Sequence, residues 1–295
     1  MSTVETAPKT KTSTAARAAA PIDTTAASLR AVYIIWYRDL LRYWRDRWRV
    51  VASLAQPLLF LVVFGSGLSS SLGGGAFGTR GGFTYIQFMY PGIIGMSILF
   101  TAIFGAMSIV WDREFGFLKE VLVAPIDRWA VAIGKALGGT TQAMIQGLIL
   151  LVLAPFVGVK LSLLTILLMI PLSAVLAFGL ASFGVMLASM MKSMQGFQVV
   201  MNFLMMPMFF LSGALFPLQG LPTWMTWITR LDPASYGIDP LRRVVLSDSG
   251  QSAMVDRFAM TIGGHVLPIG LEVGIMFAFG AILLGVAVVM FQRRD

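Results

Sequence analysis

Long uncharged stretches alternate with short charged ones along this chain of 295 residues. A membrane-spanning helix needs about 20 predominantly apolar residues, and every uncharged stretch reaches that length. A stretch at residues 258–292 carries the single charge of Glu272, and five others lack Asp, Glu, Lys and Arg altogether: residues 50–79, 81–111, 136–159, 161–191 and 193–229. The pattern predicts an all-α integral membrane protein with six transmembrane helices.

The turn and breaker residues between these stretches set the expected boundaries. Residues 51–295 form one transmembrane domain, with spans at approximately 51–69, 85–110, 129–157, 163–190, 196–214 and 266–291. Residues 1–27 are rich in Ala, Thr and Ser and contain few large apolar side chains. Because such a segment has little to bury, it predicts a disordered tail.

An amphipathic helix is predicted over residues 28–50, directly before the first span. Its arginines recur every three or four residues and share one face, beside a face of aromatic and apolar residues: Arg38, Arg42, Arg45 and Arg49, next to Tyr37, Leu41, Trp44 and Trp48. An arginine face beside a tryptophan face suits a helix that lies in the lipid headgroup layer. The alternative is a solvated basic helix, and the two tryptophans weigh against it.

The distribution of Lys and Arg predicts the orientation. With a cytosolic N-terminus and six spans, the cytosolic segments hold 16 of the 22 Lys and Arg residues and the outer segments hold 6. The positive-inside rule therefore favours a chain with both termini in the cytosol. The charged stretch at residues 111–129 then faces the cytosol between the second and third spans.

Within this stretch, Leu118, Val121 and Leu122 form a short apolar stripe at helical spacing. Pro125 ends the helix, because the residue before a proline is pushed out of helical geometry, and Asp127 is placed to cap the next one. A short two-faced helix tethered between two spans has to bury its stripe in headgroups or in a partner protein. The alternative is a polar loop whose pattern is fortuitous.

The stretch REFGFLKEVLVAP, residues 113–125, resembles the cytosolic coupling segment of the type-2 ABC transporter permease family. Phe117 departs from the family pattern, in which threonine is common. In that family the segment rests in a groove of the ATPase subunit. The resemblance implies that ATPase coupling involves Glu114, Gly116, Leu118, Lys119, Glu120, Leu122, Ala124 and Pro125.

A second stretch, residues 211–246, resembles the region after the fifth span of that family, with Asp232 in place of the usual asparagine. There it forms short re-entrant helices in the outer leaflet, and four prolines forbid one long helix here. The alternative is an ordinary outside loop with aromatic anchors. The residues expected to matter are Phe216, Pro217, Pro222, Trp224, Pro233, Tyr236, Asp239 and Arg242, and the fourth proline is Pro240.

Residues 90–100 and the basic amphipathic helix also match the family, so the resemblance extends over residues 28–295, and it is nearest to daunorubicin-resistance type drug-export permeases. It implies that the fifth span lines the substrate pathway and carries an apolar gate. Methionine adapts to varied shapes and phenylalanine offers broad apolar contact. The candidates are Asn202, Met205, Met206, Met208, Phe209, Phe210 and Leu211. Packing against neighbouring helices or lipid is the alternative for the same residues.

Candidate catalytic chemistry is sparse. The chain has no cysteine and one histidine, His265, which excludes disulfides, thiol catalysis and Cys-ligated zinc, and we expect no metal site. It has no phosphate-binding loop: Gly134 and Lys135 lack the earlier glycine and the following Ser or Thr. The resemblance therefore implies that ATP and Mg²⁺ bind a separate ATPase and that this chain is no enzyme.

Two charged residues lie inside predicted spans. Glu272, near the outer end of the sixth span, is a functional candidate by its position, and a snorkelling or hydrogen-bonded structural carboxylate is the alternative. Lys135, near the inner end of the third span, is expected to snorkel to the cytosol.

Together these features predict the permease subunit of an ABC exporter in the plasma (inner) membrane of a prokaryote, moving an amphiphilic drug- or lipid-like substrate. The expected partners are two ATPase subunits, a second permease chain that is a copy or a sister, and membrane lipid, with no nucleic acid. The alternatives are a polysaccharide or glycoconjugate exporter of the same family and a multidrug transporter driven by an ion gradient.

Overall fold

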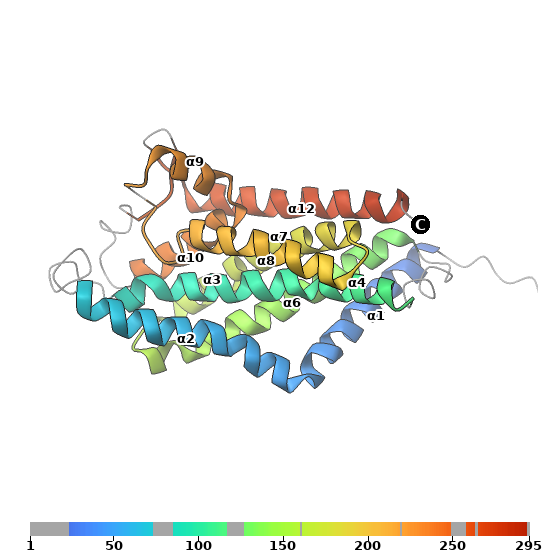
Figure 1. The fold of residues 1–295 in the computed structure, drawn as a ribbon, viewed down its shortest axis with the longest axis horizontal. Coiled ribbons are helices and arrows are strands. Elements are labelled where there is room, and N and C mark those ends of the chain that lie inside the picture. The colour runs from blue at the N-terminus through green and yellow to red at the C-terminus, as the bar shows by residue number, and fades with distance from the viewer. Residues whose placement is uncertain are drawn as a thin grey trace, which may run out of the picture.

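The computed structural model describes residues 24–72, 85–116, 127–159, 161–218, 220–248, 258–262 and 265–293. Within these ranges nearly all of the chain is helical, and the long helices run side by side along one axis (Figure 1). The helices are α1 Thr24–Arg45, α2 Arg47–Leu72, α3 Tyr85–Gly105, α4 Met107–Glu114, α6 Arg128–Leu153, α7 Leu163–Met190, α8 Met194–Leu211, α9 Thr223–Leu231, α10 Pro233–Ser247 and α12 Ile269–Arg293. A 3-10 turn, η1 Ala154–Val157, extends α6, and the two-residue strands β1 Thr261–Ile262 and β2 His265–Val266 pair antiparallel.

Five helical segments in the described part of the chain are long and apolar enough to cross a membrane: Tyr85–Glu114, Arg128–Val157, Leu163–Met190, Met194–Leu211 and Ile269–Gln292. A sixth is present if Thr25–Arg45 and Val50–Gly65, which meet at 69°, count as one bent span. The prediction of a helical membrane protein is confirmed by these five or six candidates. The orientation in the membrane and the interfacial and re-entrant positions stay predictions.

The predicted single helix over residues 28–50 is wrong, because the chain bends at Asp46. Helix α1 packs along α6, whereas α2 packs along α3, so α1 and α2 diverge from the bend (Figure 1). Every fourth residue of α1 is buried against its neighbours: Ala31, Ile35, Asp39 and Tyr43. The tryptophans predicted for the interface, Trp44 and Trp48, stay exposed at the bend.

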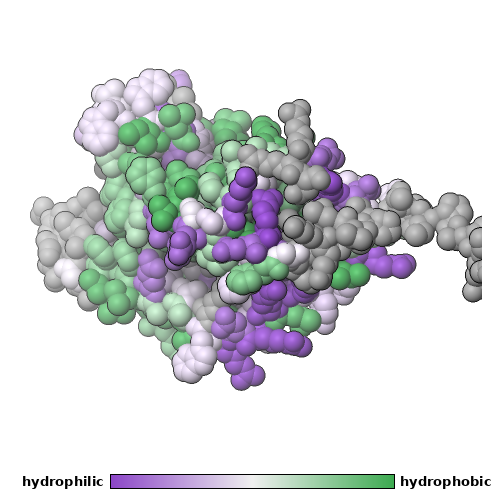
Figure 2. Space-filling view, turned by 45° about the vertical axis from the view of Figure 1, so that its right-hand side comes forward, coloured by the Kyte–Doolittle hydropathy of each residue, from purple (hydrophilic) through white to green (hydrophobic). Residues whose placement is uncertain are grey.

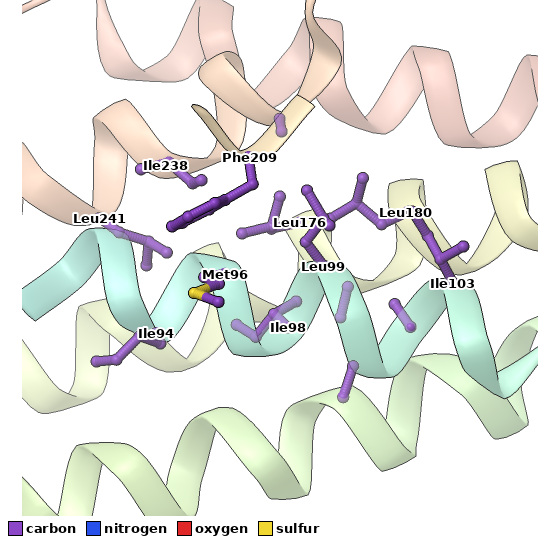
Figure 3. Packing of buried hydrophobic residues seen from close by; sticks show 14 of the residues in the cluster. Ile94, Met96, Ile98, Leu99, Ile103, Leu176, Leu180, Phe209, Ile238 and Leu241 are labelled. Atoms are coloured by element: carbon purple, nitrogen blue, oxygen red, sulfur yellow. The ribbon is translucent and has the colours of Figure 1, made fainter. Parts of the chain in front are cut away.

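Helix α3 is the centre of the bundle. It packs against α2, α6, α7, α8 and α10, and a run of its side chains is completely buried, including Phe88, Met89, Tyr90, Ile93, Ile98 and Leu99. Figure 3 shows Phe209 of α8 pointing toward this core beside Ile238 and Leu241 of α10. Burial of so many large side chains fixes α3 as the element around which the others are arranged.

The prolines of residues 211–246 act differently from one another. Pro222 precedes α9, and Pro233 occupies the first turn of α10, where its missing N–H costs nothing. Asp232 separates the two helices and caps α10, its carboxylate accepting a hydrogen bond from Ala234 N at 2.9 Å. Pro240 lies inside α10, which continues through it to Ser247.

Polar side chains gather at one end of the bundle. The start of α1, the end of α4 and the C-terminus lie together there, whereas α9 lies at the opposite end (Figure 1). Figure 2 shows hydrophilic residues over this end and hydrophobic residues over the flank beside it. We call it the α4 end.

Candidate functional site

The described part of the predicted coupling segment is its beginning. Glu114 is the last residue of α4, and Gly116 has φ +79°, a left-handed conformation that favours glycine. The turn at Gly116 stops α4 from continuing. The other predicted coupling residues lie outside the described residues: Leu118, Lys119, Glu120, Leu122, Ala124 and Pro125.

The end of α4 is bonded to the turn between α7 and α8. The Arg113 guanidinium donates to the carbonyls of Ser189, at 3.1 Å, and Met191, at 2.7 Å. The Glu114 carboxylate accepts from the backbone N–H of Met194, the first residue of α8, at 2.9 Å. A cation thus meets the carbonyl end of α7 and an anion meets the amino end of α8, both favourable with the helix dipole.

The chain after the coupling segment is also hydrogen-bonded to neighbouring helices. Asp127 stands at the N-cap position of α6, but the prediction that its side chain caps the helix is wrong. Its carboxylate instead accepts from Ser28 Oγ of α1 at 2.9 Å. Arg128 donates to the carbonyl of Phe291 in the last turn of α12 at 3.1 Å. The residues that precede 117–126 are therefore hydrogen-bonded to α7 and α8, and those that follow are hydrogen-bonded to α1 and α12.

Helices α1, α4 and α6 also bring together a largely buried group of charged side chains, which we call the inner charge cluster: Arg38, Asp39, Asp112 and Lys135. The expectation that Lys135 snorkels outward is wrong. Its ammonium is buried, 2.8 Å from Asp112 and 3.1 Å from Asp39, and it donates to Ser108 Oγ at 3.0 Å. Burying a charged amine costs desolvation free energy, and the two nearby carboxylates compensate this cost. A lysine without such partners would not be stable in this position.

Arg38 adds a second cation to this cluster. Its guanidinium donates to Asp112 at 2.8 Å, so one residue of the predicted arginine face points into the protein rather than toward headgroups. Arg42 also lies near Asp112, at 3.9 Å, so three cations face the two carboxylates. Sequence reasoning missed Asp39 and Asp112, although carboxylates in or beside apolar helices commonly pair with a cation, and Lys135 was such a cation.

The predicted pathway residues of α8 divide between two faces. Met205 and Phe209 are buried against α3 together with Phe197 and Met201, each four residues apart. Asn202, Met206 and Phe210 point outward, and Met208 and Leu211 lie at the border. The Phe209 ring meets Phe60 edge-on, with centroids 5.8 Å apart, and lies 5.2 Å from Phe210. Phe60, Phe209 and Phe210 therefore form a chain of ring contacts, with Phe209 inside and Phe210 43% exposed.

At the opposite end, Arg242 is buried, and of the predicted outer residues Asp239 lies nearest to its guanidinium. This fully buried guanidinium lies over the Phe88 ring at 4.5 Å and donates to the Gly213 carbonyl. Asp239 lies 3.9 Å from it and accepts from Met260 N at 3.0 Å. Phe216 and Pro217 follow the Gly213 turn and are half-buried, while Pro222 and Trp224 are exposed.

Tyr236 and Asp232 fix the start of α10. Tyr236 donates its hydroxyl hydrogen to the Arg230 carbonyl at 2.8 Å, joining α10 to α9. Burial raises the pKa of Asp232 to about 8, although its hydrogen bond with Ala234 N opposes this shift. Asp232 therefore holds a proton at neutral pH and resembles the neutral asparagine that it replaces in the family pattern.

Glu272 is buried and lies 3.7 Å from Arg243. The snorkelling alternative is wrong, and the ion pair favours a structural carboxylate that holds α12 against α10. The described residues contain no group of three or more His, Asp or Glu side chains placed to hold a metal ion.

Comparison with known proteins gives a consistent result. A family profile described as ABC-2 type transporter matches residues 30–246. The putative transport permease ycf38 of Cyanophora paradoxa is 27% identical over 226 residues, 72% of this chain and 73% of that protein. Inner membrane transport permease YadH of Escherichia coli (strain K12) is 29% identical over 219 residues, 72% of this chain and 81% of that protein. Probable multidrug ABC transporter permease YbhR of the same strain is 28% identical over 172 residues, 56% of this chain and 45% of that protein.

Proposed function

This chain belongs to the ABC-2 type transporter family and is therefore a membrane permease subunit of an ABC transporter, and from this premise we propose that it exports an amphiphilic drug- or lipid-like substrate. Permeases of this family pair with an ATPase subunit. The proposed assembly contains two permease chains and two ATPase subunits, and ATP and Mg²⁺ bind only the ATPase. The proposed location is the inner membrane of a prokaryote with both termini in the cytosol.

The observation that carries this proposal is the set of hydrogen bonds made by the residues on either side of the coupling segment. Arg113 and Glu114 bind the turn between α7 and α8, and Asp127 and Arg128 bind α1 and α12. A displacement of the segment by an ATPase is thus passed to four helices through direct hydrogen bonds. Helix α8 is among them, and it carries the candidate gate.

The substrate class is inferred from the outward face of α8. Phe203, Met206 and Phe210 are exposed there, with Asn202 as the polar member. Such a face suits an apolar or amphiphilic molecule better than a sugar chain, which needs hydrogen-bonding partners along its path. YbhR of Escherichia coli, named as a probable multidrug ABC transporter permease, agrees with this choice.

The test is ATP-driven transport in proteoliposomes that contain this chain and its cognate ATPase. We expect uptake of a fluorescent amphiphile into inverted vesicles with ATP, and none with an ATPase whose catalytic glutamate is replaced by glutamine. Transport that persists without ATPase and follows an imposed proton gradient would favour the gradient-driven alternative. Transport of an oligosaccharide in place of the amphiphile would favour the glycoconjugate alternative.

A further inference from the structure

A hollow of about 550 Å³ lies on the surface of α1, next to the inner charge cluster. We call it the arginine hollow, and its lining is Arg38, Leu41, Arg42, Arg45 and Asp46. The three arginines recur at spacings of four and three residues, so they share one flank of the helix. Arg38 belongs to both the hollow and the cluster, which places the hollow beside Asp112 of α4.

The hollow and the cluster together hold more positive than negative charge. Four cations and three carboxylates make up the combined set: Arg38, Arg42, Arg45, Lys135, Asp39, Asp46 and Asp112. Cations gathered in one place repel one another unless each has a counter-charge. One further negative charge would balance the set, so the hollow favours a singly charged anion.

Arg42 and Arg45 are the cations best placed to bind this anion. Arg38 and Lys135 each lie 2.8 Å from the Asp112 carboxylate, whereas Arg42 lies 3.9 Å from it, too far for a hydrogen bond. The Arg42 side chain is 48% exposed, and Arg45 is exposed as well. Residues three apart are neighbours on a helix surface, and guanidinium groups bind phosphate oxygens through paired hydrogen bonds.

Apolar neighbours indicate that the anion is part of a lipid. Leu41 lines the hollow together with the arginines. Trp44 and Trp48, at the adjoining bend, are 64% and 84% exposed, and exposed tryptophans concentrate at the membrane–water interface. A free anion gains nothing from these side chains. A phospholipid places its phosphate on the arginines and its glycerol and acyl chains against Leu41.

We propose that the arginine hollow binds the headgroup phosphate of a singly charged anionic phospholipid of the phosphatidylglycerol type. Its phosphate supplies the negative charge that the combined set lacks, whereas a zwitterionic headgroup brings its own cation and leaves the excess positive charge in place. Because the phosphate lies beside Asp112, the lipid stabilises the junction of α1 and α4. The site is separate from the α8 face proposed for substrate, so it goes beyond the proposed function.

Photolabelling tests where the lipid binds. The probe is phosphatidylglycerol with a diazirine in its acyl chain close to the glycerol, at a low mole fraction in phosphatidylcholine nanodiscs that contain the purified permease. Illumination converts the diazirine to a carbene that inserts into adjacent side chains, so we expect label within residues 41–48. Unlabelled phosphatidylglycerol should displace the probe, and unlabelled phosphatidylcholine should not.

Arg42→Gln and Arg45→Gln remove one charge each and should each weaken phosphatidylglycerol binding about fivefold, which corresponds to about 1 kcal/mol per arginine. The matched control is Arg30→Gln, because Arg30 is exposed on the same helix but does not line the hollow. This control should bind the probe as wild type does.

Thermal unfolding gives a second readout. A lipid that binds the folded state raises the melting temperature, so replacing part of the phosphatidylcholine by phosphatidylglycerol should stabilise wild type and Arg30→Gln more than the Arg42 and Arg45 variants. In pure phosphatidylcholine all four permeases should melt at similar temperatures, which shows that the variants fold.

The proposal is overturned if the three arginine variants bind the probe equally, or if phosphatidylcholine competes as well as phosphatidylglycerol. Displacement of the probe by inorganic phosphate would show a site for free anions and would overturn the lipid assignment. Loss of the label when the cognate ATPase is added would assign the hollow to that subunit instead. None of these results depends on transport, so the export proposal is tested separately.

Discussion

The Lys135 ammonium of α6 lies 2.8 Å from the Asp112 carboxylate of α4, and both side chains are buried. Helix α4 leads into residues 117–126 and α6 follows them, so this ion pair joins the two helices that flank the proposed coupling segment. Asp39 brings α1 into the same cluster, 3.1 Å from the ammonium. The inner charge cluster therefore links α1, α4 and α6 through buried ion pairs.

Lys135→Met should destabilise the protein strongly, because it removes the buried cation that Asp39 and Asp112 share and leaves them only the more exposed arginines. Breaking a buried pair from one side costs about 3–5 kcal/mol. Thermal unfolding of the purified permease measures the effect. Adding Asp112→Asn to Lys135→Met should recover part of the loss, and Lys192→Met, at an exposed site, should change little. Equal melting temperatures for the Lys135 and Lys192 variants would contradict this account.

Glu114→Ala should reduce coupling while leaving the ATPase bound. The substitution removes the 2.9 Å hydrogen bond from Met194 N, which is worth about 1 kcal/mol. In our proposal, displacement of the coupling segment reaches α8 through this hydrogen bond. The measurement is substrate transported per ATP hydrolysed in proteoliposomes, and we expect a drop of several-fold. Glu114→Gln keeps an acceptor oxygen and should restore most of the ratio. If alanine and glutamine behave alike, the bond to α8 carries no displacement.

Asp232→Asn should remove a pH dependence of stability. The folded protein raises the pKa of Asp232 from its ordinary value near 4 to about 8, so the folded state binds the proton more tightly than the unfolded chain. Stability from this group is therefore present at low pH and is lost as pH rises between the two values. Asparagine caps Ala234 without titrating. The melting temperature of the Asp232→Asn variant should exceed that of wild type by a margin that grows from pH 5 to pH 8. A margin that stays constant with pH would argue against a titrating Asp232.

Gly92→Ala should destabilise the contact between α3 and the turn after α8. A Cβ atom at Gly92 would lie 2.3 Å from the carbonyl oxygen of Ala214, and backbone on both sides leaves little room to adjust. Overpacking of this kind costs about 1–3 kcal/mol, read as a lower melting temperature. Gly274→Ala in α12 is the matched control: its Cβ would meet no atom within 4 Å, and alanine favours the helix by up to about 1 kcal/mol. A Gly92 variant as stable as this control would refute the close contact.

The sequence predicts the helices well where a membrane leaves the chain little choice. A long uncharged stretch can satisfy its backbone in lipid only as a helix, so the apolar runs agree with α3, α6, α7, α8 and α12. The family pattern likewise pointed to Arg242, whose side chain is fully buried.

Contacts between distant residues could not be predicted in the same way. The partners of Lys135 are 23 and 96 residues away, and only the packing of α1 and α4 on α6 brings them together. The bend at Asp46 arises because α1 and α2 pack on different helices.

Co-purification with the cognate ATPase tests the central claim most directly. The permease would be expressed with the ATPase as wild type, Glu120→Arg and Leu122→Asp, with Lys192→Met as the control. We predict that the ATPase is retained by wild type and by the control and is lost from both coupling variants, while all four permeases remain folded. An ATPase that binds all four equally, or none of them, would contradict the assignment of residues 113–125 as the coupling segment.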